Sequence, residues 1–146
     1  MFSKEAAAQL RKEFWTSFGK SFPRKWLLYN TKIKGLSFKF VANKKKALVC
    51  LDIEHTDAAA NVLLYAQLSS LKNILLSEHI ATLIFDENYT LESGKVIARI
   101  YCQLPQEFNI HNKNTWRDCY EFFVKEMTAF ELFFYEYEDY IAQAID

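Results

Sequence analysis

Two stretches near the middle of the sequence alternate between apolar and other residues. They are GLSFKFVA (35–42) and KALVCLDIE (46–54), and the polar turn Asn43-Lys44-Lys45-Lys46 joins them. Alternation with period two predicts β-strands, and a short polar loop between two such runs predicts an antiparallel hairpin. A four-residue loop places Ala42 opposite Ala47, and this pair sets the register of the whole hairpin.

One face of this predicted hairpin is apolar and the other is mixed. The apolar pairs are Leu36–Ile53, Phe38–Leu51 and Phe40–Val49. The mixed pairs are Gly35–Glu54, Ser37–Asp52, Lys39–Cys50 and Val41–Leu48. The apolar face is expected in the core, and the mixed face is the expected place for a binding function.

A second hairpin is predicted downstream. ATLIFD (81–86) is its first strand, its turn contains Glu92-Ser93-Gly94-Lys95, and VIARIYCQL (96–104) is the return strand. In the return strand Ile97, Arg99, Tyr101 and Gln103 share a face, opposite to that of Val96, Ala98, Ile100, Cys102 and Leu104. Residues 26–31 are expected to form a short additional strand.

Helical spacing predicts three helices. In the first, Ser3 is the expected N-cap, the apolar positions are Ala7, Leu10, Phe14 and Phe18, and Gly19 and Pro23 end the helix. The second runs over 58–77, with Leu64, Leu68, Leu71 and Leu75 on one side and Val62, Leu63, Ala66 and Ile74 widening that side. Such a broad apolar surface predicts burial against a sheet.

The third predicted helix covers residues 112–145 and contains no Gly or Pro. Its apolar seam follows heptad spacing: Trp116, Tyr120, Phe123, Met127, Phe130, Phe134, Tyr137 and Ile141. A second stripe, Cys119, Phe122, Ala129, Phe133, Tyr140 and Ala144, lies beside it. This surface is wider than one small sheet covers, so we predict a homodimer through the C-terminal helix; the alternative is a monomer whose helix bends around its own core.

The chain is therefore predicted to be one α+β domain over residues 1–146, with an antiparallel sheet of four or five strands and three helices, the last one long. Its 146 residues are 51% apolar and include 13 Phe, which is enough material for one core. The N-terminal stretch mixes charged residues into its first turns, and no apolar run is long enough for a bilayer. With three widely spaced cysteines, these features predict a cytoplasmic protein with reduced thiols and no membrane association.

Charge is distributed unevenly, although the net charge is +0. Residues 1–50 contain twelve Lys/Arg and two Asp/Glu, whereas residues 51–146 contain six and sixteen. One interpretation is that the two halves attract each other within one fold. The other is a basic surface around Lys44, Lys45 and Lys46 that binds an anionic partner.

Few residues point to catalysis. With only 3 Gly, phosphate-binding loops of dinucleotide or triphosphate sites are excluded, and no cofactor is expected. Asp52 and Glu54 point the same way at the end of a strand, as in the acidic pair of restriction-endonuclease-like nucleases. Position 54 is not the Lys of that motif, however, and the preceding strand offers no Asp. Lys39 lies diagonally from Asp52, so a cross-strand ion pair is the competing interpretation.

Four separated motifs carry a resemblance to a known family. LRKEFWTSFGK (10–20), LDIEHTD (51–57), ESGKVIARIY (92–101) and NTWRDCYEFF (114–123) resemble, in order, a bacterial family of small uncharacterised domains, domain of unknown function four-two-six-eight. The resemblance implies that members of this family occur alone or fused to nuclease-like segments, and that no activity is established for the family. Its recurring positions here are Phe14, Trp15, Glu54, Asp57, Gly94, Arg99, Tyr101 and Trp116.

These observations favour a non-enzymatic interaction module that binds protein or nucleic acid. The alternative is a divergent or degenerate metal-dependent nuclease. The candidate binding residues lie on the polar face of the predicted sheet: Lys39, Asp52, Glu54, Arg99 and Tyr101. No catalytic or metal-binding residue is assigned.

Overall fold

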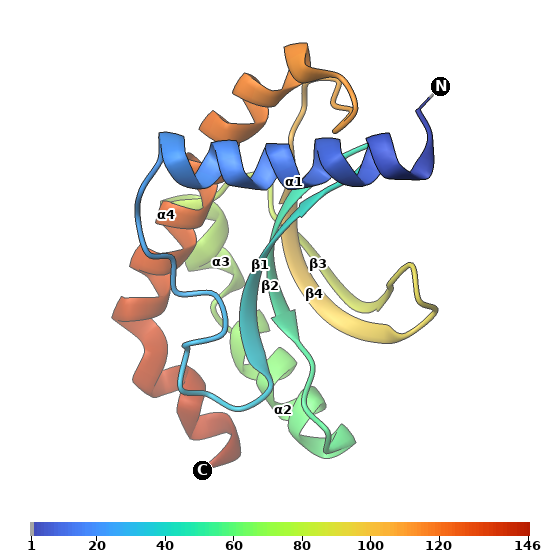
Figure 1. Cartoon of the computed structure of the whole chain (residues 1–146). Helices are drawn as coiled ribbons and strands as arrows, with labels where there is room; N and C mark the ends of the chain where they lie inside the picture. Colours follow the sequence, from blue (N-terminus) through green and yellow to red (C-terminus); the bar gives the residue numbers. More distant parts are fainter. Residues whose placement is uncertain (1) are drawn as a thin grey trace.

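Helices lie before, between and after two β-hairpins in the computed structural model, which describes residues 2–146 (Figure 1). The strands are β1 (Leu36–Ala42), β2 (Ala47–Ile53), β3 (Ile84–Thr90) and β4 (Val96–Gln103). The helices are α1 (Lys4–Ser21), α2 (Ala58–Ser69), α3 (Lys72–Ile74) and α4 (Trp116–Ala142). A π-helical segment (Leu75–His79) follows α3, and short 3-10 turns (Lys113–Thr115 and Gln143–Ile145) flank α4. The predicted α+β class with a long C-terminal helix is confirmed.

The strands form one antiparallel sheet in the order β1-β2-β4-β3. The first hairpin has the predicted register along its whole length, from Leu36 opposite Ile53 to Ala42 opposite Ala47. The two hairpins join through β2 and β4, which places Asp52 directly opposite Arg99. This central pairing therefore unites the polar faces of both hairpins.

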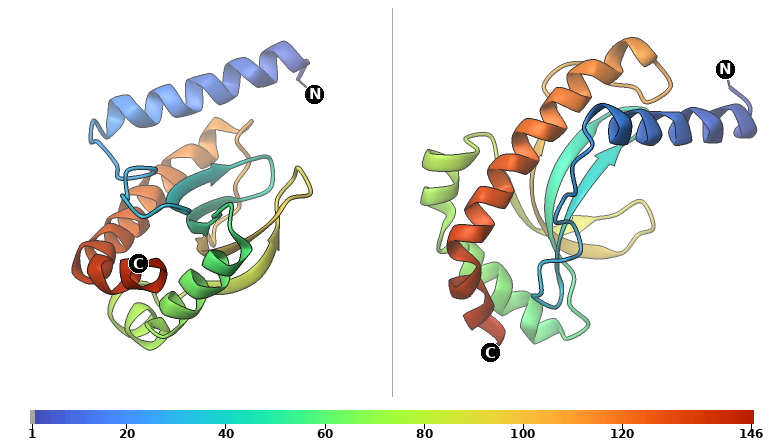
Figure 2. Two further views of the ribbon diagram at one scale, coloured as in Figure 1. Left: turned by 90° about the horizontal axis from the view of Figure 1, so that it is seen from below. Right: turned by 60° about the vertical axis from the view of Figure 1, so that its left-hand side comes forward.

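Helices α2 and α4 cover one face of the curved sheet. Figures 1 and 2 show α4 and α2 on one side of it, while the β3–β4 hairpin projects away from them. The apolar sheet face packs under these helices: Phe38 contacts Phe130 and Phe134 at ring-centroid distances of 5.6 and 5.7 Å. The opposite face carries the polar residues predicted for a site, and Leu48, Cys50 and Asp52 at its centre are also fully buried.

The first helix begins as predicted, because the Ser3 hydroxyl accepts a hydrogen bond from the Ala6 N–H at 3.1 Å. It continues past Gly19 to Ser21. Phe14 and Phe18 are buried against α4, and Phe14 lies 5.0 Å from Tyr120 between ring centroids. This contact holds α1 across the turn end of the first hairpin (Figure 1).

The α4 seam is covered largely by the chain itself. All of its predicted positions are buried except Tyr137, which is half-buried. Their neighbours include α1 and the apolar sheet face. Phe133 of the second stripe contacts His79 of the π-helical segment. The helix has 27 residues, a length of about 40 Å.

Buried Glu131 connects the acidic α4 to the basic N-terminal half. It accepts a hydrogen bond from the Leu27 N–H at 2.7 Å and forms an ion pair with Arg24. Arg24 also donates to the Thr128 hydroxyl at 2.9 Å. The two oppositely charged halves therefore attract each other here within one chain.

Two sequence predictions of secondary structure were wrong. Residues 26–31 form no strand, because this segment turns: Leu28 and Lys32 have φ values of 45° and 64°. The expected single helix over 58–77 is broken after Ser69 into α2, α3 and the π-helical segment. Its leucine side is buried as predicted. Val62, Leu63 and Ala66 are exposed, the first two by 59% and 51%, so these three residues do not widen the buried side.

The second hairpin also differs from its prediction. Strand β3 begins at Ile84 and runs on to Thr90, with a register shift between Asp86 and Tyr89. The Asp86 carboxylate accepts a hydrogen bond from the Asn88 N–H at 2.9 Å, which stabilises this bulge. Gly94, in the predicted turn of this hairpin, has a positive φ of 90°. No helix within residues 2–146 combines the length and apolar character that crossing a membrane requires.

Candidate functional site

At the centre of the polar sheet face lies a buried ion pair between β2 and β4. Arg99 donates two hydrogen bonds to Asp52, from Nε to Oδ1 at 2.7 Å and from a terminal nitrogen to Oδ2 at 2.9 Å. Asp52 is 0% exposed and Arg99 is 4% exposed. Two charges can be buried at this depth because each compensates the other. Since Asp52 lies on β2 and Arg99 on β4, the pair links the two hairpins.

Lys39 and Glu54 extend this pair along the sheet. Lys39 Nζ lies 3.3 Å from Asp52 and 3.5 Å from Glu54, and Lys95 Nζ donates to Glu54 at 2.7 Å. Burial lowers the pKa of Lys39, but the two carboxylates outweigh this effect and raise its pKa. The hydrogen bond from Lys95 opposes the effect of burial and, with the charge of Lys39, holds the pKa of Glu54 below its ordinary value. The diagonal Lys39–Asp52 pair expected from the sequence is therefore present.

Tyr89 covers this charged centre. The Arg99 guanidinium lies 4.4 Å from the centre of the Tyr89 ring, a cation–π distance. Lys46 Nζ is 3.1 Å from the Tyr89 hydroxyl, and the Tyr101 ring meets Tyr89 edge-on at 5.4 Å. Burial raises the pKa of Tyr101 above its ordinary value, with Tyr89 adding to the effect. The β3 bulge therefore brings an aromatic residue that the sequence did not place in the site.

The two carboxylates that suggested a nuclease are each occupied by cations of the protein. Within residues 2–146 no group of three or more His, Cys, Asp or Glu is arranged to hold a metal ion. Both oxygens of Asp52 accept from Arg99, and Glu54 is paired with Lys95 and Lys39. In this arrangement Asp52 and Glu54 do not form a free acidic pair.

A large groove opens beside the polar face, between α1, the β1–β2 turn and the β3–β4 hairpin. It has a volume of about 970 Å³, and we call it the basic groove. Its cations are Arg11, Lys44, Lys45, Lys46 and Arg99, against a single carboxylate, Glu92. Its aromatic rings are Trp15, Phe40, Tyr89 and His111. A concave surface of positive charge and aromatic rings is typical of nucleic-acid-binding proteins.

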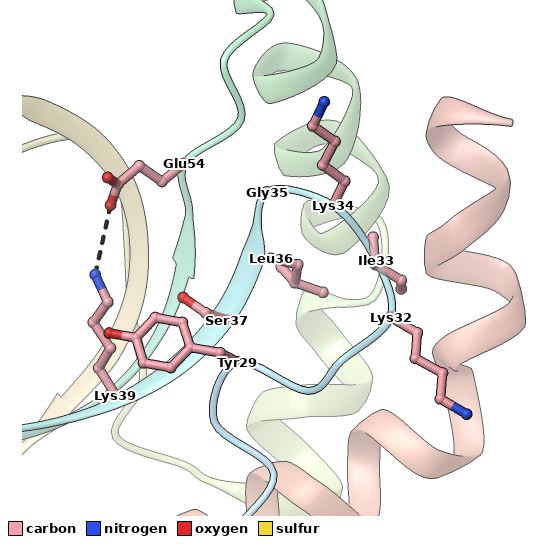
Figure 3. A pocket seen from close by; sticks show the side chains of 9 residues that line it. All are labelled: Tyr29, Lys32, Ile33, Lys34, Gly35, Leu36, Ser37, Lys39 and Glu54. Carbon is pink, nitrogen blue, oxygen red and sulfur yellow. Dashed lines mark ion pairs between the residues drawn. The ribbon is translucent and has the colours of Figure 1, made fainter.

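A smaller pocket of about 620 Å³ lies at the opposite end of strand β1 (Figure 3). Tyr29, Ser37, Lys39 and Glu54 point toward one another across it, whereas Lys32 and Lys34 extend away on the other side of the loop. The loop is pinned by the buried Thr31 hydroxyl, which donates to the Leu36 carbonyl at 2.8 Å. Lys39 therefore belongs both to this pocket and to the charged centre of the sheet.

The structure brings together most of the residues that the sequence pointed to. Lys39, Asp52, Glu54 and Arg99 form one network, and Tyr101 packs beside it through Tyr89. Lys44, Lys45 and Lys46 lie in the basic groove instead, together with Trp15. Sequence reasoning missed Arg11, Tyr89 and His111, and Arg11 had a detectable signal because it precedes Trp15 by one helical turn.

Comparison with known families assigns the chain to one of them. The family described as "Domain of unknown function (DUF4268)" matches residues 10–138. The match covers most of the chain, so the protein belongs to this family, as the sequence motifs indicated. No curated protein and no solved structure matches the chain.

Proposed function

We propose that this domain is a non-enzymatic module that binds nucleic acid through the basic groove. The observation that carries the proposal is the groove itself, where Arg11, Lys44, Lys45 and Lys46 stand against one carboxylate, Glu92, around aromatic rings. Within residues 2–146 neither Lys44, Lys45 nor Lys46 forms an ion pair with an acidic side chain. Lysines that lack acidic partners are available to phosphates, which favours a nucleic acid over an acidic surface patch of the same chain.

The polar face supports the groove. The Asp52–Arg99 pair fixes the two hairpins relative to each other, and Tyr89 extends from this pair to Lys46. Lys46 and Arg99 line the groove as well. We therefore assign Lys39, Asp52 and Glu54 the role of positioning the groove, and Arg99 and Tyr101 that of supporting its floor.

The proposal is tested by measuring the affinity of the purified chain for a short fluorescent oligonucleotide at low salt. A Lys44→Ala, Lys45→Ala, Lys46→Ala triple variant should bind at least about 10-fold more weakly, because each phosphate contact contributes to affinity. The matched control removes three exposed lysines outside the groove, Lys12, Lys20 and Lys125. It lowers the net charge equally and should bind like wild type. Equal loss in both variants, or no binding by wild type, would overturn the proposal.

A homodimer through α4 stays a prediction of the sequence. Because most of the seam packs within the chain, an interface would use Leu132 and Tyr135, which are 61% and 58% exposed. We propose sedimentation of wild type and of a Leu132→Glu, Tyr135→Glu variant at micromolar concentration. A wild-type dimer that becomes a folded monomer supports the prediction, and a wild-type monomer refutes it.

We also propose a cytoplasmic location. Cys50, Cys102 and Cys119 are all free and buried. Burial raises the pKa of each thiol, which keeps it protonated and unreactive. Free buried thiols are typical of proteins in a reducing compartment. Fractionation of the cells that produce the protein tests the location.

A further inference from the structure

Trp15 lies at the edge of the core and keeps part of its indole exposed. Its neighbour Phe14 is 0% exposed and fills the core, whereas Trp15 is 37% exposed. One face of the indole lies against Phe123, with ring centroids 5.9 Å apart and ring planes at 8°. Phe14 supports it edge-on at 4.9 Å. The ring is therefore held in one orientation by buried aromatic residues and contributes its exposed part to the basic groove.

The surroundings of Trp15 suit a nucleotide. Arg11 lies one helical turn earlier on the same side of α1, and Lys44 and Lys45 line the groove on the β1–β2 turn. A base stacked on the indole would leave its phosphates next to these cations. Aromatic side chains in cationic grooves bind bases in this way, because every base has a flat face and the phosphates are always negative.

The other three rings of the groove are already engaged, and Phe40 packs against Phe123 with ring centroids 4.7 Å apart. Tyr89 carries the Arg99 guanidinium over its ring and meets Tyr101 edge-on. His111 meets Phe2 edge-on, with ring centroids 5.2 Å apart. Trp15 is thus the ring of the groove that combines a supported inner face with substantial exposure, so a single base is expected to stack there.

We infer that the basic groove takes single-stranded nucleic acid, with one base stacked on Trp15. This inference rests on the proposed function and specifies the ligand. In a duplex the base faces are covered by neighbouring base pairs, so a duplex offers its phosphates but no free base face to Trp15. A single strand offers both, and so gains an additional contact in this groove.

The test compares three probes: a short oligothymidylate, a duplex of the same length, and inorganic polyphosphate, which has no bases. Trp15→Leu should weaken oligothymidylate binding about 10-fold, the effect expected for losing one stacked base. Polyphosphate binding should stay unchanged, and Trp15→Phe should recover much of the lost affinity. The control is Trp26→Leu, which alters a half-buried indole that lies outside the groove.

Fluorescence gives a second measurement that does not depend on a variant of Trp15. In a Trp26→Phe chain, oligothymidylate should quench the emission of Trp15, because Trp116 is only 6% exposed and inaccessible to the ligand. Polyphosphate should leave this emission unchanged.

The outcomes separate this inference from the proposed function. If wild type binds all three probes equally and Trp15→Leu changes none of the affinities, the groove binds polyanions and the inference is wrong. If Trp15→Leu weakens polyphosphate and oligothymidylate equally, the loss is structural and the inference is wrong as well. If wild type binds none of the probes at low salt, the proposed function itself fails.

Discussion

Replacing Arg99 with methionine keeps an unbranched side chain at this position of β4 and removes the guanidinium. Asp52, which is 0% exposed, then loses two hydrogen bonds of 2.7 and 2.9 Å. Lys39, 3.3 Å away, is its remaining cationic partner. Breaking a buried ion pair on one side costs about 3–5 kcal/mol, because the other charge stays buried without its partner. We expect the lower end of this range, since Lys39 still compensates in part.

A loss of about 3 kcal/mol is large for a domain whose free energy of unfolding is expected to be about 5–15 kcal/mol. For a chain of this size it corresponds to a decrease in Tm of about 10 °C. The assay is urea unfolding followed by circular dichroism. The matched control is Lys95→Met. Lys95 is a partner of Glu54 and its side chain is 58% exposed, so its loss should lower the free energy of unfolding by no more than about 1 kcal/mol.

The double variant Asp52→Leu, Arg99→Met tests whether the pair acts as a unit. It removes both charges together, so stability should return to within about 1 kcal/mol of wild type. The reasoning is refuted if Arg99→Met alone costs less than about 1 kcal/mol. It is also refuted if Mg²⁺ raises the wild-type Tm and Asp52→Ala abolishes that shift, because Asp52 would then bind a cation and the nuclease alternative would gain support.

Three further predictions concern the periphery of the sheet. Because lysine partners hold the pKa of Glu54 below its ordinary value of 4.5, its stabilising effect is complete at neutral pH and is lost as the pH falls through the lowered pKa. The Tm difference between wild type and Glu54→Gln should therefore narrow in melts below pH 4.5, and a constant difference contradicts this. Gly35→Ala should cost more stability in urea unfolding than Gly94→Ala. Both glycines have positive φ, but a Cβ at position 35 would come within 2.6 Å of His55, whereas a Cβ at position 94 would meet no atom within 4 Å. Equal losses would contradict the geometry. Glu131→Gln should cost about 1–3 kcal/mol and speed amide hydrogen exchange in residues 22–35, because its carboxylate anchors this loop; unchanged exchange would contradict that role.

The parts of the fold that the sequence predicted correctly depend on local pattern. A one-residue slip around Phe38 and Leu51 would turn the apolar face to solvent, and the four-residue turn selects the observed register among the remaining ones. Ser3 marks the start of α1 because its side chain satisfies a free N–H of the first turn. Gly94 marks its turn because the backbone there needs a positive φ.

The errors arose where longer-range structure overrides local preference. Leu28 lies in a run with strand-like composition, yet its positive φ follows from a loop that Glu131 and Thr31 hold in place. The helix expected over 58–77 keeps its leucine side buried but changes to a π-helical turn at Leu75. Glu131 lies on α4, far from residues 26–31 in the sequence, so the composition of that segment does not reveal the contact.

The candidate site could be predicted from the sequence only in part, for the same reason. Alternation placed Asp52 and Arg99 on polar faces of separate hairpins, but their contact required the knowledge that β2 pairs with β4. Tyr89 reaches Arg99 through a bulge, which changes the register that simple alternation predicts. His111 enters the groove from a loop, where no periodic pattern exists.

Phosphate binding in the basic groove is the central property proposed for this domain. The salt dependence of oligonucleotide affinity measures directly how many phosphates the groove neutralises. Each neutralised phosphate of a single strand contributes about 0.7 to the slope of log K against log salt concentration. The Lys44→Ala, Lys45→Ala, Lys46→Ala variant should therefore show a slope smaller by about 2 than wild type. The control that lacks Lys12, Lys20 and Lys125 should keep the wild-type slope. Identical slopes for wild type and the groove variant, or equal decreases in both triple variants, would contradict the account.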